Sequence, residues 1–301
     1  MFLPIPKTSE RKAISPEGTD EDMKRGKRSR WIYGVGILLL AVLLPGCQRQ
    51  HGGLSVVGST SVEPFAEALA EEYMSQHSRE KIFVQGGGSS AGIQAVRTGA
   101  AEVGMSSRNL MDSEKDLIAV PIIYDAIAVI VHRDNPLNDL TLNQIRKIFS
   151  AEITRWSELG GKNHPLTLVT REEGSGTREA FQKLIMGEKE ISLGALVQDS
   201  NGAIRQVVAD DRNAIGYISL GLVNDRVKAL KIDGIEPNIE NIQHHRYKIV
   251  RPFLFVFKSN PQGLAKDFLD YILSPAGQKL LVQEGLISMN PIPEPKKEAR
   301  R

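Results

Sequence analysis

The fold class is indicated most directly by residues 54–75, LSVVGSTSVEPFAEALAEEYMS. The first four residues form a short β-rich run, and the next four, Gly58 to Ser61, carry a glycine and three hydroxyls. After them, apolar residues repeat at spacings of three and four, which places one apolar stripe along a helix. Pro64 lies in the first turn, where a helix tolerates proline. The segment therefore predicts a strand, a turn of glycine and hydroxyl residues, and an amphipathic helix over residues 62–75.

The same alternation continues along the chain without an internal repeat or a low-complexity linker. Strands are predicted at residues 54–57, 81–84, 103–105, 118–122, 126–132, 166–169, 214–218 and 253–257. Further helices are predicted at residues 93–98, 178–186, 264–273 and 275–284. Strands that alternate with helices are typical of α/β layers, in which helices flank a mainly parallel sheet.

Composition and charge exclude several classes of protein. The chain has 301 residues, of which 41% are hydrophobic and 25% are charged, and it has one cysteine. These values exclude a disordered chain and one held together by disulfides. Residues 1–46 hold eight basic and five acidic residues, so the rest of the chain carries 30 basic residues against 31 acidic ones. A body this close to neutral lacks the basic surface that a nucleic acid would need.

Residues 1–46 are predicted to be a signal peptide region. Residues 24–30, KRGKRSR, form a charged segment, and the apolar run WIYGVGILLLAVLL follows it directly. This order is typical of a secretory signal. The preceding residues are polar and do not fit a signal, so we expect translation to begin at Met23. An intact-mass measurement of the precursor that found earlier residues would contradict this start.

The end of the apolar run, Leu43-Leu-Pro-Gly-Cys47, resembles the lipobox of bacterial lipoproteins. In those proteins the cysteine thiol is diacylated and the chain is cut just before it. The resemblance implies a lipid on Cys47 and a linker over residues 47–53. The alternatives are a buried thiol or a short transmembrane anchor, but the run is below the roughly 20 residues that span a bilayer.

Three predicted strand-to-helix turns share a chemistry that suits an anion. They are Gly58-Ser-Thr-Ser61, Gly86-Gly-Gly-Ser-Ser-Ala-Gly92 and Glu173-Gly-Ser-Gly-Thr177. The first N–H groups of a helix are unpaired and its dipole is positive there, so such turns can hold an oxyanion. Arg171 precedes the third turn, and its planar guanidinium can hold two oxygens at once. Taken singly, each turn also fits an ordinary helix cap, and Arg171 fits a surface ion pair with Glu172 or Glu173.

Several motifs occur in the order seen in periplasmic phosphate-binding proteins. Besides the three turns, they are Val103-Gly-Met-Ser-Ser-Arg108, Ile148-Phe-Ser-Ala-Glu-Ile-Thr-Arg-Trp156, Asn201-Gly-Ala-Ile-Arg-Gln-Val-Val208 and Ala214-Ile-Gly-Tyr-Ile-Ser-Leu-Gly221. From about Leu54 to about Pro291, the chain thus resembles the substrate-binding lipoproteins of high-affinity phosphate ABC transporters. The resemblance implies a type II-like periplasmic-binding-protein fold, with two α/β lobes joined by two crossover hinges. Residues 54–125 and 251–301 would form the first lobe, and residues 126–250 the second.

The resemblance also implies a ligand set. The residues that would bind phosphate are Thr60, Ser61, Ser89, Ser107, Arg171, Ser175, Gly176 and Thr177. In the best-known members, a carboxylate at the position of Ser107 accepts the proton of phosphate. A serine hydroxyl donates as well as accepts, so it discriminates less against sulfate, which has no proton to donate.

Three further residues are secondary candidates at the same site. Asp125 would replace the missing carboxylate, or else be a structural residue at a crossover. Arg108 would be a second cation, or else the surface partner of Asp112. Ser90 would be an additional contact to the ligand.

By the same resemblance, we expect an extracytoplasmic, lipid-anchored monomer. It would capture inorganic phosphate between its lobes and deliver it to the permease of an ABC transporter, without catalysis. No cofactor is predicted, and no metal site is predicted because the six histidines lack the spacing of metal ligands. An alternative is a receptor for another tetrahedral oxyanion, such as sulfate or molybdate.

An α/β-hydrolase is the alternative from a different class. Gly88-Ser-Ser-Ala-Gly92 fits the nucleophile-elbow pattern and lies between a predicted strand and a predicted helix. Ser90 would be the nucleophile. The base and the acid would come from His244 or His245 and from Asp199 or Asp210.

Overall fold

The computed structural model describes residues 52–288, which belong to one compact unit of residues 52–301. The predicted signal peptide region and Cys47 lie outside the described residues, as do residues 289–301. Within residues 52–288, no helix is long and apolar enough to cross a membrane.

Nine strands form one sheet in the order β2-β1-β3-β11-β4-β8-β6-β7, with β9 paired to β4. Their bounds are β1 Leu54–Gly58, β2 Ile82–Gly86, β3 Val103–Ser106, β4 Ile118–His132, β6 Thr167–Arg171, β7 Leu196–Gln198, β8 Ala214–Ser219, β9 Val227–Ala229 and β11 Val250–Phe257. Two short strands, β5 Asp139–Leu140 and β10 Lys231–Ile232, pair with each other. The outer pairs in each half are parallel, whereas β11 and β4 make antiparallel pairs at the centre.

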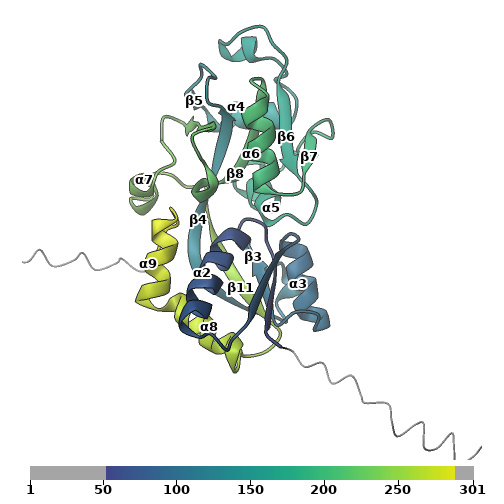
Figure 1. Cartoon of the computed structure of the whole chain (residues 1–301). Coiled ribbons are helices and arrows are strands. Elements are labelled where there is room, and N and C mark those ends of the chain that lie inside the picture. Colours follow the sequence, from purple (N-terminus) through teal and green to yellow (C-terminus); the bar gives the residue numbers. More distant parts are fainter. Residues whose placement is uncertain (1–51, 289–301) are drawn as a thin grey trace, which may run out of the picture. The chain divides into compact units, whose positions relative to one another are not determined.

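The first lobe is built on β1, β2 and β3 and lies in the lower half of Figure 1. Its helices are α2 Glu63–Gln76, α3 Ser89–Thr98, α8 Leu264–Leu273 and α9 Pro275–Gln283. The predicted apolar stripe of α2 is buried, and Phe65 and Tyr73 of this stripe contact Phe253 and Phe268. The amphipathic helix predicted over residues 62–75 is therefore confirmed, since its apolar stripe faces the core. Burial of the stripe stabilises the lobe because it removes apolar surface from water.

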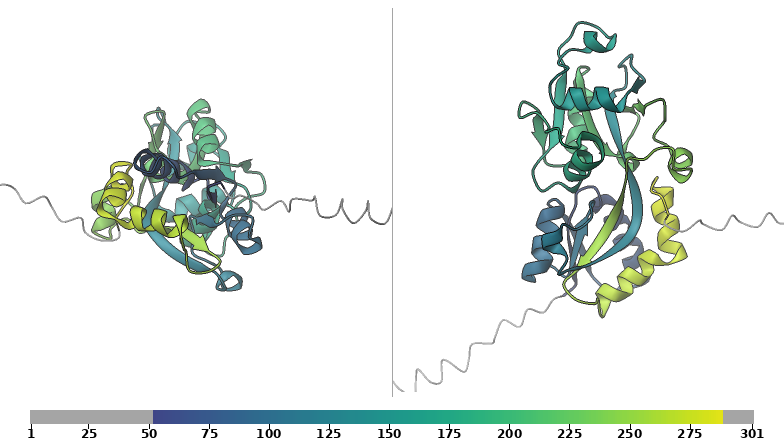
Figure 2. Two further views of the ribbon diagram at one scale, coloured as in Figure 1. Left: turned by 60° about the horizontal axis from the view of Figure 1, so that its bottom comes forward. Right: turned by 180° about the vertical axis from the view of Figure 1, so that it is seen from behind.

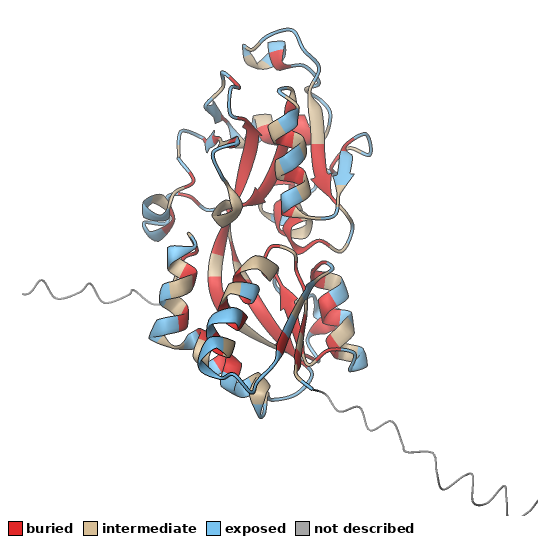
Figure 3. Ribbon diagram, in the orientation of Figure 1, coloured by how far each residue is buried: buried red, intermediate tan, exposed pale blue. Residues whose placement is uncertain are grey.

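The second lobe is built on β6, β7 and β8, in the upper half of Figure 1. Its helices are α4 Leu142–Phe149, α5 Gly176–Phe181, α6 Asn201–Asp210 and α7 Ile239–Gln243. The rings of Phe181 and Tyr217 stack in its core with centroids 3.8 Å apart, and Phe149 packs edge-on against both. Figure 3 shows that the central strands are mostly buried, whereas the outer sides of the helices and the edge strand β7 are exposed.

Strand β4 passes from the first lobe into the second, and β11 starts at the junction and runs back through the first lobe beside it, as the views of Figures 1 and 2 both show. They pair in antiparallel register, with Asp125 opposite Arg251 and Ala126 opposite Val250. The α/β class and the two-lobed arrangement with two crossovers agree with the prediction. The antiparallel centre of the sheet was not predicted. It arises because β11 returns to the first lobe alongside β4.

The predicted strands are all present, but two of them belong to a single longer strand. Residues 118–122 and 126–132 are parts of the continuous strand β4, because pairing with β11 carries the strand through the intervening residues. The helix predicted at residues 93–98 begins earlier, at Ser89. The helix predicted at residues 178–186 is divided into α5 and a π-helical segment, Gln182–Met186.

Candidate functional site

Hydroxyl side chains from the two lobes meet where the lobes join. Ser61, in the turn before α2, has its Oγ 2.7 Å from Oγ1 of Thr177 near the start of α5. Ser89, the first residue of α3, has its Oγ 3.4 Å from Oγ of Ser107 and accepts the Ser107 backbone N–H at 3.1 Å. All four side chains are buried. The structure thus brings together hydroxyls from turns that are far apart in the sequence.

Ser59 adds a hydroxyl that the predicted ligand set lacks. Its Oγ donates to Ser107 Oγ at 2.9 Å and accepts the backbone N–H of Ser61 at 3.2 Å. It therefore joins the Ser61 turn to Ser107. Ser175, by contrast, caps α5, because its Oγ accepts the backbone N–H of Arg178 at 3.3 Å.

Gly176 allows the two lobes to approach closely. A Cβ at this position would collide with Ser89 Oγ and would lie 2.7 Å from Ser107 Oγ. Nearby, Ser90 donates its backbone N–H to the carbonyl oxygen of Gly174 in the second lobe, at 3.1 Å. The main chains of the lobes are therefore in direct contact at the site.

Arg171, the last residue of β6, brings a cation to the same place. Its side chain is 1% exposed, and its Nε and Nη2 donate to the two carboxylate oxygens of Glu172 at 2.8 Å each. Nη2 also donates to Oγ1 of Thr60 and to the carbonyl oxygen of Asp199, both at 3.0 Å. The alternative predicted a surface ion pair with Glu172 or Glu173. The pair with Glu172 forms, but its surface location is wrong, because the guanidinium is buried and contacts Thr60 of the first lobe.

The remaining nitrogen of Arg171, Nη1, is buried and has no hydrogen-bond partner within the described part of the chain. Burying a charged donor without a partner is costly, typically about 1–3 kcal/mol or more. An anion at this point would supply the acceptor that Nη1 lacks. Chemically, the arrangement can therefore bind a small oxyanion between the lobes.

Arg251 is a second buried guanidinium, which the predicted ligand set does not contain. Its Nε and Nη2 donate to Oδ2 of Asp125 at 3.0 and 2.8 Å, and its Nη1 donates to Oγ1 of Thr177 at 2.7 Å. Nη1 also donates to the carbonyl oxygen of Ser107 at 3.3 Å. Arg251 thus links a crossover strand to hydroxyl-bearing residues of both lobes.

Asp125 is fully buried, and both of its carboxylate oxygens accept hydrogen bonds. Oδ1 accepts from the Ser219 hydroxyl at 2.7 Å, and Oδ2 accepts from Arg251. Burial raises the pKa of Asp125, and the Arg251 guanidinium acts in the opposite direction. These contacts match the structural alternative for Asp125, a residue that holds a crossover. The role of proton acceptor for phosphate stays a prediction.

Arg108 pairs with two carboxylates and not with Asp112. Its Nη1 and Nη2 donate to Glu114 at 2.7 and 2.9 Å, and its Nε lies 2.6 Å from Oε2 of Glu179 in the second lobe. The pairing with Asp112 is wrong because Arg108 is buried between the lobes, while Asp112 is exposed and pairs with Lys115. Hydrogen bonding to Arg108 lowers the pKa of Glu114, and burial raises the pKa of Glu179.

The triad needed by the hydrolase alternative is not assembled. Ser90 Oγ accepts from Arg108 Nη2 at 3.2 Å. Neither His244 nor His245, which follow α7, bonds to Ser90 within the described residues. Among residues 52–288, no three His, Cys, Asp or Glu side chains are grouped so as to hold a metal ion.

Two residues of the site that lie outside the predicted ligand set stand in sequence contexts that indicate a buried role. Arg251 is the one charged residue in the otherwise apolar strand β11, which is a sign of a buried partner. Asn201 is the first residue of the motif Asn201-Gly-Ala-Ile-Arg-Gln-Val-Val208, and its Nδ2 donates to Ser61 Oγ at 2.8 Å. Neither partner is close in sequence, so residue spacing could not identify them.

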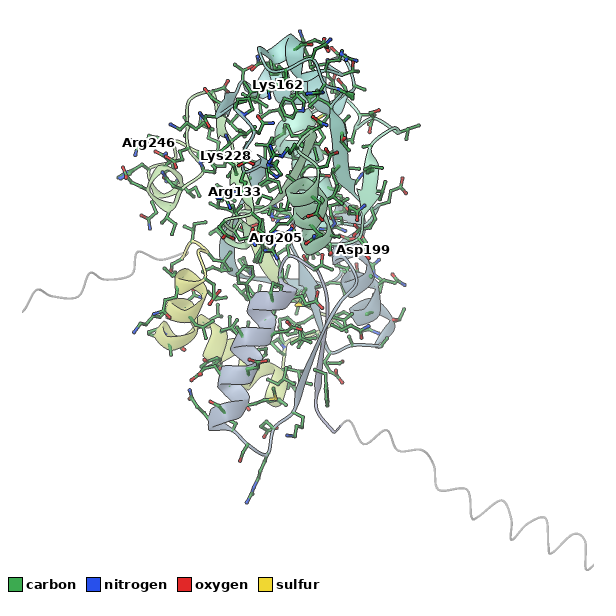
Figure 4. The ribbon with its side chains drawn as sticks, turned by 45° about the horizontal axis from the view of Figure 1, so that its top comes forward. Arg133, Lys162, Asp199, Arg205, Lys228 and Arg246 are labelled. Atoms are coloured by element: carbon green, nitrogen blue, oxygen red, sulfur yellow. The ribbon has the colours of Figure 1, made fainter. Side chains whose placement is uncertain are left out.

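A cavity of about 390 Å³ lies elsewhere, at the end of the second lobe. Its lining includes Trp156, Lys162 and Arg212, and none of the predicted ligand residues. In Figure 4, Lys162 lies near the top of the molecule, whereas Asp199, whose carbonyl accepts from Arg171, lies where the lobes meet. The predicted anion-binding residues are therefore packed between the lobes and do not line this cavity.

Comparison with known proteins places the chain among binding proteins. The sequence model of the PBP superfamily domain matches residues 45–276. The phosphate-binding protein PstS of Bacillus subtilis is 35% identical over 246 residues, which cover 79% of this chain and 81% of the relative. PstS of Pseudomonas aeruginosa is 30% identical over 281 residues, with 82% and 87% covered.

Solved structures agree with these relatives. A Clostridium perfringens protein assigned as a phosphate ABC transporter substrate-binding protein, solved with bound phosphate, is 44% identical with a TM-score of 0.77. The match covers 79% of this chain and all of that protein. An ABC-type phosphate transport receptor from Vibrio cholerae is 36% identical with a TM-score of 0.66, covering 78% and 99%.

Proposed function

We propose that the chain, which belongs to the PBP superfamily and within it to the PstS phosphate-binding proteins, captures inorganic phosphate between its two lobes. It then delivers the phosphate to an ABC permease. The proposal includes release of phosphate unchanged, action as a monomer and a location outside the cytoplasm. Family membership supports the transport role, and the contacts between the lobes support the position of the site.

The observation that carries the proposal is that Nη1 of Arg171 is buried without a hydrogen-bond partner in the described part of the chain. Hydroxyls from both lobes surround the same junction, so an anion there would be held by donors from each side. We assign phosphate binding to Thr60, Ser61, Ser89, Ser107, Arg171, Ser175, Gly176 and Thr177. Because the donors come from both lobes, binding favours the conformation in which the lobes are together.

Isothermal titration of the purified chain with phosphate, sulfate and molybdate tests this function. Phosphate should bind about ten- to a hundredfold more tightly than sulfate, since its proton can be donated to a hydroxyl such as that of Ser107. Sulfate has no proton to donate, so it can only accept the hydrogen of such a hydroxyl and loses one of the two ways of pairing with it. Tighter binding of sulfate or molybdate than of phosphate would contradict the proposal in favour of the other oxyanion.

We also propose that the hinge divides the chain after Asp125 and before Arg251. Residues 54–125 and 251–301 would then form the first lobe, and residues 126–250 the second. The buried residues of two apolar clusters support this division, because those of one lie within residues 54–123 and 253–286, and those of the other within residues 126–249, apart from Ile287.

A lipid on Cys47 would anchor the protein at the outer face of a membrane, with residues 47–53 as the linker. The support is the lipobox-like sequence before Cys47. Cys47→Ser should move the protein from the membrane fraction to the soluble fraction of the cell envelope, without changing its affinity for phosphate. Retention of the variant in the membrane fraction would contradict lipid anchoring.

A further inference from the structure

Six buried residues beside the proposed phosphate site form a closed ring of hydrogen bonds. In order around the ring they are Asp125, Arg251, Thr177, Ser61, Asn201 and Ser219. The six bonds measure 2.7 to 3.1 Å, and none of the residues is more than 2% exposed. The ring includes one residue from each crossover strand and residues of both lobes, so it closes only when the lobes are together.

The direction of the bonds around Asn201 is determined by a backbone group. Oδ1 of Asn201 accepts the backbone N–H of Ser219 at 3.1 Å, and a backbone N–H can only donate. The side-chain amide is therefore oriented with its Nδ2 towards Ser61, to whose Oγ it donates at 2.8 Å. A flipped amide would place two donors against each other.

Arg251 determines the direction of its hydrogen bond to Thr177, as Asn201 does for its bond to Ser61. A guanidinium has five N–H donors and no acceptor, so Nη1 of Arg251 can only donate to Oγ1 of Thr177. The charge of Arg251 is paired with Asp125, so the ring as a whole is neutral. Arg251 thus acts on the site by orienting the hydroxyl of Thr177, whose oxygen must face the guanidinium.

We propose that Asn201 and Arg251 are positioning residues that reserve the hydrogens of Ser61 and Thr177 for the anion. A hydroxyl has one hydrogen, and neither Asn201 Nδ2 nor Arg251 Nη1 can accept it. When an anion enters, the bond between Ser61 and Thr177 can be exchanged for two bonds to ligand oxygens. Both oxygens act as acceptors, so the ligand must present at least two oxygens that can accept a hydrogen bond. This inference rests on the proposed function.

A double-mutant cycle on Ser61 and Asn201 tests the proposal. Asp at position 201 has nearly the shape of Asn but only accepts, so it would take the Ser61 hydrogen away from the anion. Affinity for inorganic phosphate is measured by titration calorimetry for the wild type, Asn201→Asp, Ser61→Ala and the double variant. We expect about a hundredfold loss for Asn201→Asp and about tenfold for Ser61→Ala.

The cycle separates orientation from charge. The added charge of Asp repels the anion equally with and without the Ser61 hydroxyl, so that contribution cancels. We expect the Asn201→Asp loss to be at least about tenfold smaller in the Ser61→Ala background, because no hydroxyl is left to reorient. Equal losses in both backgrounds would overturn the inference.

Asn201→Ala provides an independent check. A merely structural role predicts that Ala, which removes the amide, is worse than the nearly isosteric Asp. The positioning role predicts that Asp costs more affinity than Ala, because Ala leaves the Ser61 hydrogen free, and that this excess shrinks in the Ser61→Ala background, where only the charge of Asp remains. Thermal unfolding without phosphate shows whether each variant is folded. A folded wild type that binds no phosphate would overturn the proposed function and this inference with it, whereas intact wild-type binding with Ala worse than Asp would overturn this inference alone.

Discussion

Replacement of Arg171 by alanine is expected to weaken phosphate binding by about a hundred- to ten-thousandfold, which corresponds to the loss of about two charge-assisted hydrogen bonds. Arg171 is the cation at the junction whose Nη1 has no hydrogen-bond partner among residues 52–288. Its removal also frees Thr60, whose hydroxyl Arg171 holds. Titration calorimetry with phosphate measures the loss.

Two control variants make the Arg171 result specific. Arg171→Lys keeps the charge but loses the planar fork, so its affinity should lie between those of the wild type and Arg171→Ala. Arg226→Ala removes an exposed arginine that pairs with Asp210 and should leave affinity within about twofold, because exposed charges are screened. Unchanged affinity in Arg171→Ala would remove Arg171 from the site.

Asp125→Asn is expected to have the largest effect on stability, a loss of about 3–5 kcal/mol in the free energy of unfolding. The substitution keeps the shape of the side chain but leaves the buried Arg251 charge without its counter-ion. Removing one partner of a buried pair is costly because the other charge stays out of water. Denaturation in urea, followed by circular dichroism, measures the change.

An exposed pair gives the matched control. Asp210→Asn removes the partner of Arg226, and both side chains of this pair are about half exposed. That substitution should cost less than about 1 kcal/mol. The double variant Asp125→Asn with Arg251→Met should recover part of the stability lost in Asp125→Asn, because no buried charge remains. If Asp125→Asn were as stable as the wild type, the pair would not hold the crossovers together.

The elements of the fold were predictable where the pattern is local. The strand at residues 54–57 and the helix that follows it were evident from apolar spacing, because burial of one face imposes that spacing. Helices α8 and α9 were predicted to within one residue of their observed ends. The continuity of β4 was not predicted, since its middle residues look like a break until β11 is placed beside them.

The candidate site was predictable only in part. Turns rich in glycine and hydroxyls placed Ser61, Ser89 and Thr177 at or near helix starts, because helix starts attract such residues whatever their tertiary contacts, and the family resemblance proposed them as ligands. The partners of those hydroxyls were not identified. Arg251 and Asn201 lie 74 and 140 residues from the hydroxyls that they contact, and a single sequence records no contact at that distance.

Local chemistry in the chain was sufficient to predict the α/β class and the glycine and hydroxyl turns, and to propose Arg171 as the cation, since each of these depends on neighbouring residues. The packed lobes decided the rest. They determine which nitrogen of Arg171 has no partner among residues 52–288, which carboxylate neutralises Arg251, and in which direction the amide of Asn201 donates. The reason is that hydrogen-bond direction and burial belong to groups that meet only after the two crossovers bring the lobes together.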